Sequence, residues 1–208
     1  MDQLTSLIDH KLVADVLPEH TSSNREYLYA SNGVFVRAVR PGLVAIVPVH
    51  WYDRAIPGLG AIAPIVQLTP RLPEFLLLQA WQRCYAACIK SKELLCHFVY
   101  ENSSWQLVVP DQIQEKTTCY PPNQPDSSYY SATIDLHSHQ RYPAYFSDTD
   151  NADEVGFRLY IVLGQLHLPT PQILTRVGIF GHYWIIPTAW VAEGADHFID
   201  VAFENAPC

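Results

Sequence analysis

The sequence is short of cations: 13 lysines and arginines stand against 21 aspartates and glutamates, a formal net charge of −8 over 208 residues. An acidic chain without basic clusters argues against general nucleic-acid binding, which needs many cationic contacts to phosphate. No apolar run reaches the roughly 18 residues that a transmembrane helix requires. The first residues also lack a basic segment followed by an apolar one, so we expect neither a membrane span nor a secretory signal.

Cysteine is scarce as well, with five copies in the chain. An odd number without a C-x-x-C motif predicts no disulfide framework. Cys84 and Cys88 stand four residues apart in an apolar stretch, which is typical of buried thiols on one face of a helix. Cys119 could block a metal site as a thiolate, but we interpret it as an ordinary loop cysteine. These features fit a reducing compartment, and we expect a cytoplasmic protein.

The apolar content predicts a folded chain. Hydrophobic residues make up 49%, which allows a sizeable core and argues against wholesale disorder. The length permits one large domain, or one domain with a substantial extension. The segment from Pro70 to Pro73 marks the expected boundary. Residues 1–70 are therefore predicted to form a small β-rich extension, and residues 71–208 the main domain.

The N-terminal extension is expected to contain one helix and a few strands. Residues 4–17 form the helix candidate, which Pro18 would end. Asn32-Gly33 is a dipeptide typical of tight hairpin turns between strands. The strand candidates cover residues 27–30, 34–39 and 43–49.

The main domain alternates between helix and strand patterns. A helix is expected over residues 73–90, with proline at its start as helices tolerate. Residues 116–129 are predicted to form a loop by their composition. A bend is expected at Gly181 within the last strand pattern. The strand candidates cover residues 93–101, 104–109, 131–136, 157–164 and 175–187.

One pattern in the main domain points to chemistry: His137, His139, Ser147 and Asp150, in the spacing H-x-H-x7-S-x-x-D. Residues i and i+2 of a strand point to the same side, so both imidazoles can reach one ion. Ser147 begins an N-cap sequence that leads toward a helix, which can bring Asp150 to the same place. Two imidazoles, a carboxylate and a water describe a hydrolytic zinc site. The alternative, two half-buried strand histidines beside a helix cap, leaves Ser147 without a role.

These residues resemble the JAMM motif of the MPN (Mov34/PAD-1) superfamily of zinc isopeptidases, which has simpler bacterial relatives. The resemblance covers residues 73–186 and implies an α/β (α+β) fold, a mixed β-sheet flanked by helices with cytidine-deaminase-like layering. It also implies that Zn²⁺ is held by the three ligands His137, His139 and Asp150.

The family pattern includes a glutamate just after the first long helix, and Glu93 stands in that place. One departure is that Cys96 replaces the usual glycine. Glu101 and Glu74 are the rival carboxylates, and both fit the motif position less well. The resemblance implies that Glu93 moves a proton from water to the leaving amine, and that Ser147 donates a hydrogen bond to the developing oxyanion.

The implied activity is hydrolysis of a peptide or isopeptide bond after the C-terminus of a ubiquitin-like protein. Two alternatives stay open: a zinc hydrolase of the same fold that acts on a small-molecule or amino-acid conjugate, and a non-catalytic scaffold. The chain is also similar to the A-protein family of the bacterial PRTRC cassette. That similarity implies a ubiquitin-like protein and a ThiF/E1-like protein as partners, and it leaves the oligomeric state open.

Several neighbouring residues have two interpretations. Asp148, Asp153 and Glu154 could orient the histidines, but we interpret them as a solvated first stretch of helix, where acidic residues are favoured. His97 could approach the site, but a satisfied strand histidine is the simpler interpretation. The aromatic residues 142–146 are expected to pack beneath or beside the cleft, with substrate contact as the alternative.

Overall fold

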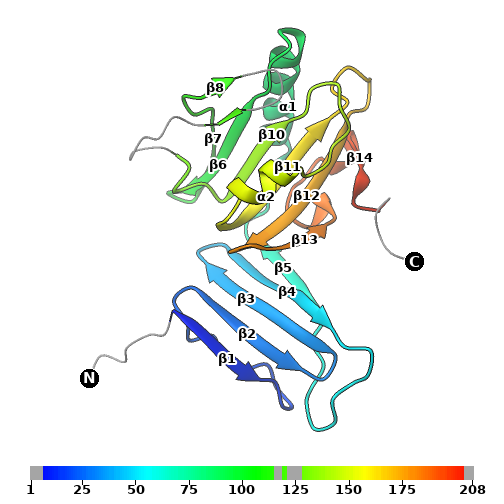
Figure 1. The fold of residues 1–208 in the computed structure, drawn as a ribbon. Coiled ribbons are helices and arrows are strands. Elements are labelled where there is room, and N and C mark those ends of the chain that lie inside the picture. The colour runs from blue at the N-terminus through cyan, green and yellow to red at the C-terminus, as the bar shows by residue number, and fades with distance from the viewer. Residues whose placement is uncertain (1–6, 115–118, 121–127, 204–208) are drawn as a thin grey trace.

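The computed structural model describes residues 7–114, 119–120 and 128–203, which form two mixed β-sheets and few helices (Figure 1). The N-terminal sheet is ordered as in the sequence, with β1 parallel to β2 and the other neighbours antiparallel. Its strands are β1 (Ile8–Leu12), β2 (Arg25–Ala30), β3 (Gly33–Arg40), β4 (Leu43–Trp51) and β5 (Ile65–Leu68). The β-rich character expected of the first residues is confirmed.

Strand β1 corrects one prediction, because residues 8–12 are extended and not part of a helix over 4–17. Their side chains alternate between exposed and half-buried, which is the period of a strand. The backbone pairs with β2, where Ile8 stands opposite Arg25. A partner strand further along the chain therefore decides the structure here, as is common for β-sheets, where context outweighs local preference.

The second sheet has seven strands, in the order β13-β12-β11-β10-β6-β7, with β14 paired to β12. β10 and β11 are parallel, whereas β6 is antiparallel to β10. The strands are β6 (Leu95–Glu101), β7 (Ser104–Val108), β10 (Ile134–Ser138), β11 (Phe157–Gly164), β12 (Gln172–Ile179), β13 (His182–Ile186) and β14 (Ile199–Asp200). A separate short pair joins β8 (Ile113–Gln114) to β9 (Cys119–Tyr120). The strand pattern expected of the main domain is thus confirmed, apart from the short β8, β9 and β14.

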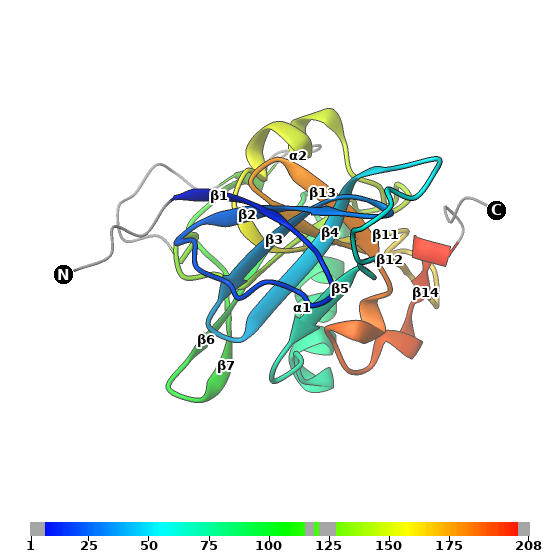
Figure 2. The ribbon, with the colours of Figure 1, turned by 90° about the horizontal axis from the view of Figure 1, so that it is seen from below.

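Two α-helices cover opposite faces of the second sheet, as Figures 1 and 2 show together. α1 (Glu74–Ile89) follows Pro73 as expected, and α2 (Asp148–Asp153) follows Ser147. Three short 3₁₀ turns stand near the C-terminus, over Thr188–Trp190, Ala195–His197 and Val201–Phe203. Within the described residues no helix is long and apolar enough to cross a membrane.

The central strand β10 separates an apolar side from a polar side. Ile134 and Leu136 belong to the main hydrophobic cluster, together with Leu77 and Cys84 of α1. Because side chains alternate along a strand, the residues between them face α2 instead. His137 is the residue that this alternation directs toward α2.

The two sheets share that hydrophobic cluster, which includes Val36 and Ala45 from the N-terminal sheet. Polar contacts also join them. Arg40 at the end of β3 donates to the carbonyl oxygens of Ala132 and Phe157 at 3.0 and 3.1 Å. The two sheets are therefore packed against each other through both apolar and polar contacts.

Glu26 provides a test of the N-terminal sheet. Burial opposes its ionisation, but hydrogen bonds from Lys11, Thr21 and Arg37 outweigh burial and lower the pKa of Glu26 to about 2. Glu26→Gln should reduce the free energy of unfolding by about 3 kcal/mol at neutral pH, because it leaves the buried Arg37 uncompensated. Urea unfolding measures this loss, with the exposed Glu101→Gln as the matched control.

The pH dependence of that loss has a definite sign. A depressed carboxyl pKa stabilises the folded chain above the unfolded pKa, and this contribution disappears as pH falls toward about 2. The difference between Glu26→Gln and the unchanged protein should therefore narrow below about pH 4.5. A loss no larger than that of Glu101→Gln would show that the Glu26 network does not stabilise the sheet.

Candidate metal centre

Two buried imidazoles meet at the carboxyl end of β10. His137 is in the strand, and His139 continues it through a hydrogen bond from its backbone N–H to the carbonyl of Leu163 in β11 at 2.8 Å. The Nε2 atoms of His137 and His139 lie 3.2 Å apart, and each residue is 7% exposed. The structure thus places both predicted histidines on one side of the strand, at one point.

Asp150 completes a set of three. Its Oδ1 lies 3.4 Å from Nε2 of His137, and the candidate ligand atoms of His137, His139 and Asp150 lie within 4.8 Å of one another. The three residues are therefore a group that could hold a metal ion, formed from a strand and a helix that are separate in the sequence.

A capping box holds Asp150 in this position. The Ser147 Oγ accepts from the backbone N–H of Asp150 at 3.2 Å, while the Asp150 Oδ2 accepts from the backbone N–H of Ser147 at 2.6 Å. The Ser147 hydroxyl also donates to Oδ2 at 2.7 Å. In such a box the two residues satisfy the free donors of the first helical turn. Because Ser147 occupies Oδ2, the other oxygen, Oδ1, is the one directed at His137.

The protonation states of the three residues suit a cation. Burial lowers the pKa of His137 and of His139, although the charge of Asp150 opposes that shift, so both rings are neutral at neutral pH. Burial opposes the ionisation of Asp150, but His137 and the hydrogen bonds from Ser147 outweigh it and lower its pKa. Neutral imidazoles and an ionised carboxylate are the forms that bind metals.

Glu93 lies in the segment between α1 and β6 and is 6% exposed. Its neighbour Leu94 exchanges two hydrogen bonds with Ser138, the residue between the two histidines, both at 3.1 Å. Burial raises the pKa of Glu93 to about 7, and the charge of Asp150 adds to the rise. The carboxyl group is thus next to the candidate centre and titrates near neutrality.

The rival carboxylates lie elsewhere. Glu74, at the start of α1, accepts a hydrogen bond from the ring of His197 at 2.7 Å on the surface. Glu101 ends β6, and because β6 is antiparallel to β10 with Leu95 opposite His137, that end points away from the histidines. Glu93 is therefore the upstream carboxylate that the fold brings to the site.

A buried ion pair beneath the site was not expected from the sequence. The guanidinium of Arg176 in β12 donates to Glu154 Oε2 at 2.9 and 2.6 Å and to Asn151 Oδ1 at 2.6 Å. The other oxygen of Glu154 lies 3.9 Å from Nδ1 of His137. Burial raises the pKa of Glu154, and Arg176 opposes that rise. The interpretation of Glu154 as a solvated helix residue is wrong, because Arg176 draws it into the interior.

Other predicted neighbours fall beside the centre. The buried His97 bonds to Ser128 Oγ at 2.8 Å and stands 3.8 Å from Asp135, so it behaves as a strand histidine. Tyr145 packs edge-on against the ring of His139, with 4.6 Å between ring centroids. The side chain of Cys119 lies outside the described part of the chain. The aromatic segment thus borders the site, as expected.

Comparisons with known proteins assign no family to this chain, so any functional assignment depends on its own residues. The chain matches no known protein-family model, and no curated protein matches it.

The contact between Arg176 and α2 gives a testable consequence. Arg176→Lys keeps the positive charge but cannot donate from one planar fork to Glu154 and Asn151 at once. If the three candidate ligands hold a metal ion, their affinity for it should fall by roughly 10- to 100-fold, as is common when a group that orients a metal ligand is lost. Titration of chelator-treated protein against a zinc indicator measures this, with the exposed Arg71→Lys as control. Equal zinc affinity in Arg176→Lys and Arg71→Lys would show that Arg176 does not contribute to metal binding.

Proposed function

We propose that the chain is a zinc-dependent hydrolase of the JAMM type that cleaves a peptide or isopeptide bond after the C-terminus of a ubiquitin-like protein. The observation that carries this proposal is the convergence of His137, His139 and Asp150 on one point. The buried carboxyl group of Glu93 beside them supplies the acid–base group that such a reaction requires.

The spacing of the ligand atoms supports zinc. Zinc binds imidazole nitrogen at about 2.0–2.1 Å in tetrahedral sites, so two ligands of one ion stand about 3.3–3.4 Å apart. The separations from His137 Nε2 to His139 Nε2 and to Asp150 Oδ1 are 3.2 and 3.4 Å. Three protein ligands of mixed nitrogen and oxygen type leave a fourth position for water, which is the composition of catalytic zinc sites.

A zinc ion at this position supplies Lewis acidity that activates water and polarises a carbonyl group. The chain supplies the proton transfers. The Glu93 carboxylate takes a proton from the attacking water and passes it to the nitrogen of the departing amine. Its raised pKa matches that double task, because a group that titrates near pH 7 can both accept and return a proton.

Ser147 supports the same chemistry in one of two ways. Its hydroxyl donates to Asp150 Oδ2 and so helps to fix that ligand. A hydroxyl has one proton, so Ser147 would have to exchange Asp150 for the substrate carbonyl oxygen in order to stabilise an oxyanion. Ser147→Ala separates the roles: loss of zinc affinity indicates the first, and loss of kcat with unchanged zinc affinity indicates the second.

Metal content tests the zinc assignment directly. Protein purified without chelator should contain about one zinc ion, as expected for the set of three ligands found among the described residues, measured by inductively coupled plasma mass spectrometry. The His137→Ala/His139→Ala variant should contain none, whereas His182→Ala, a histidine of β13 outside the set, should keep it. Absence of zinc from the unchanged protein, with no uptake on titration, would remove the basis of the proposal.

Glu93→Gln tests the catalytic assignment. The variant should retain zinc and lose turnover by at least about 100-fold, the usual size of a general-base contribution. Cleavage of a reporter fused to a Gly-Gly-tailed ubiquitin-like protein measures turnover. An acylated amino acid as substrate tests the alternative small-molecule hydrolase. Full activity in Glu93→Gln, or loss of its zinc, contradicts the assignment.

The pH profile gives a further check on Glu93. Burial favours its protonated form, so the base is inactive below its pKa and active above it. The rate should rise with pH and reach a plateau above about 7, and a bound cation moves the midpoint lower. A rate that is flat across this range would show that a group other than Glu93 limits proton transfer.

A further inference from the structure

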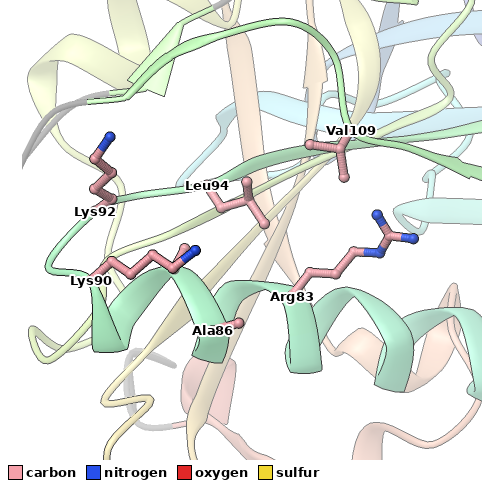
Figure 3. A pocket seen from close by; sticks show the side chains of 7 residues that line it. Arg83, Ala86, Lys90, Lys92, Leu94 and Val109 are labelled. Carbon is pink, nitrogen blue, oxygen red and sulfur yellow. The ribbon is translucent and has the colours of Figure 1, made fainter.

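A basic pocket lies between α1 and the second sheet. Its volume is about 270 Å³, and its walls are Arg83, Ala86, Ala87, Lys90, Lys92, Leu94 and Val109. Figure 3 shows Arg83 and Lys90 extending from α1 into the space below Leu94 and Val109. The pocket therefore has an apolar floor and cationic edges.

The charge of this pocket is not neutralised by the described residues. Lys11, Arg37 and Arg176 are paired with carboxylates in the described structure. By contrast, no carboxylate lines the pocket, and the contacts of the described residues include no ion pair for its three cations. In a chain of net charge −8, such a cluster favours an anionic ligand from outside.

The spacing of the three cations indicates the shape of the anionic ligand that the pocket would bind. Arg83 in α1 and Lys90, the C-cap residue directly after the helix, are seven residues apart, which places their backbones about 10 Å apart along the helix axis. A single phosphate would leave part of the charge of the three cations unneutralised and the apolar floor uncovered. In an extended peptide, residues i, i+2 and i+4 face one side and span about 13 Å. An acidic, an apolar and a second acidic residue in that arrangement match the two cationic edges and the floor.

Other anions fit less well. The pocket lies at the C-terminal half of α1, where the helix offers no free N–H groups to a phosphate. Nucleic acid needs a long basic surface, and three cations on a protein of net charge −8 do not provide one. An acidic, extended segment of a protein is the ligand class that the pocket favours.

The pocket is joined to the candidate centre through consecutive residues. Lys92 and Leu94 line the pocket. Glu93, which stands between them in the sequence, is buried, and both its burial and the charge of Asp150 raise its pKa. Leu94 also exchanges hydrogen bonds with Ser138, between the two histidines. The pocket and the candidate centre therefore lie on opposite faces of the second sheet, and the segment Lys92–Leu94 contributes residues to both.

We propose that the pocket between α1 and β6 binds an acidic, extended segment of the polypeptide that is cleaved, with the pattern acid-x-apolar-x-acid. The identification of the bound segment as part of the substrate rests on the proposed function. The binding itself does not depend on zinc, because the pocket residues and the three candidate ligands are different side chains.

The experiment uses a fluorescein-labelled peptide of repeated Glu-Ser-Val-Ser units and the full chain at low ionic strength. Fluorescence anisotropy should show saturable binding that weakens as salt is added. The Arg83→Glu/Lys90→Glu variant should bind at least about tenfold more weakly, because reversed charges repel the carboxylates. Arg54→Glu, an exposed reversal in the loop after β4, is the matched control and should bind as before.

Three results overturn the proposal: no binding, equal binding of a peptide with glutamine in place of glutamate, or unchanged binding by Arg83→Glu/Lys90→Glu. Displacement of the peptide by inorganic phosphate or by a polyuridylate oligonucleotide at lower concentration also overturns it. Repeating the titration with chelator separates it from the proposed function. Binding that survives chelation supports the pocket even if the unchanged protein hydrolyses no substrate.

Discussion

The geometry of the candidate centre depends on one buried guanidinium. α2 has six residues and no buried side chain, so no apolar face holds it against the sheet. Arg176 provides the charged part of the attachment: it bonds Glu154 and Asn151 and lies between the rings of Phe146 and Tyr183, at 3.8 and 4.0 Å from their centroids. The Tyr183 hydroxyl adds to it and lies 2.9 Å from the carbonyl oxygens of both Asn151 and Glu154. The position of Asp150, and with it the third ligand, follows from these contacts.

Burial of these polar groups lowers the stability of the folded chain, but it also sets the protonation states that the proposed reaction requires. Burial of polar groups is unfavourable unless they are paired, and the two histidines, Asp150 and Glu93 are all removed from most solvent. Removal from solvent keeps the imidazoles neutral and raises the pKa of Glu93 to about 7. A bound cation would offset part of this cost, because it gives the lone pairs of three ligands a common partner.

Local patterns predicted most of the fold, because those signals lie within one element, and the spacing H-x-H-x7-S-x-x-D predicted which three candidate ligands meet. α1 begins after Pro73 as its sequence indicates, β11 covers the expected apolar run, and the Ser147–Asp150 spacing forms a cap. What failed depended on distant partners. β1 is a strand because β2 is beside it, and Glu154 is buried because Arg176, from another strand, reaches it. The spacing of residues along the chain does not show these contacts, nor the pocket that α1 and the second sheet form around Arg83, Lys90 and Lys92.

The segment Lys92–Leu94 connects the basic pocket to the candidate metal centre. Its outer residues line the basic pocket, and its middle residue is the carboxyl group beside the ligands. The hydrogen bonds between Leu94 and Ser138 fix the backbone of this segment against β10. An acidic peptide that contacts Lys92 and Leu94 would restrict the segment further and hold Glu93 in place. A small substrate that leaves the pocket empty would lack that restriction. Under the proposed function we therefore expect a polypeptide that fills the pocket to be cleaved faster than a small conjugate.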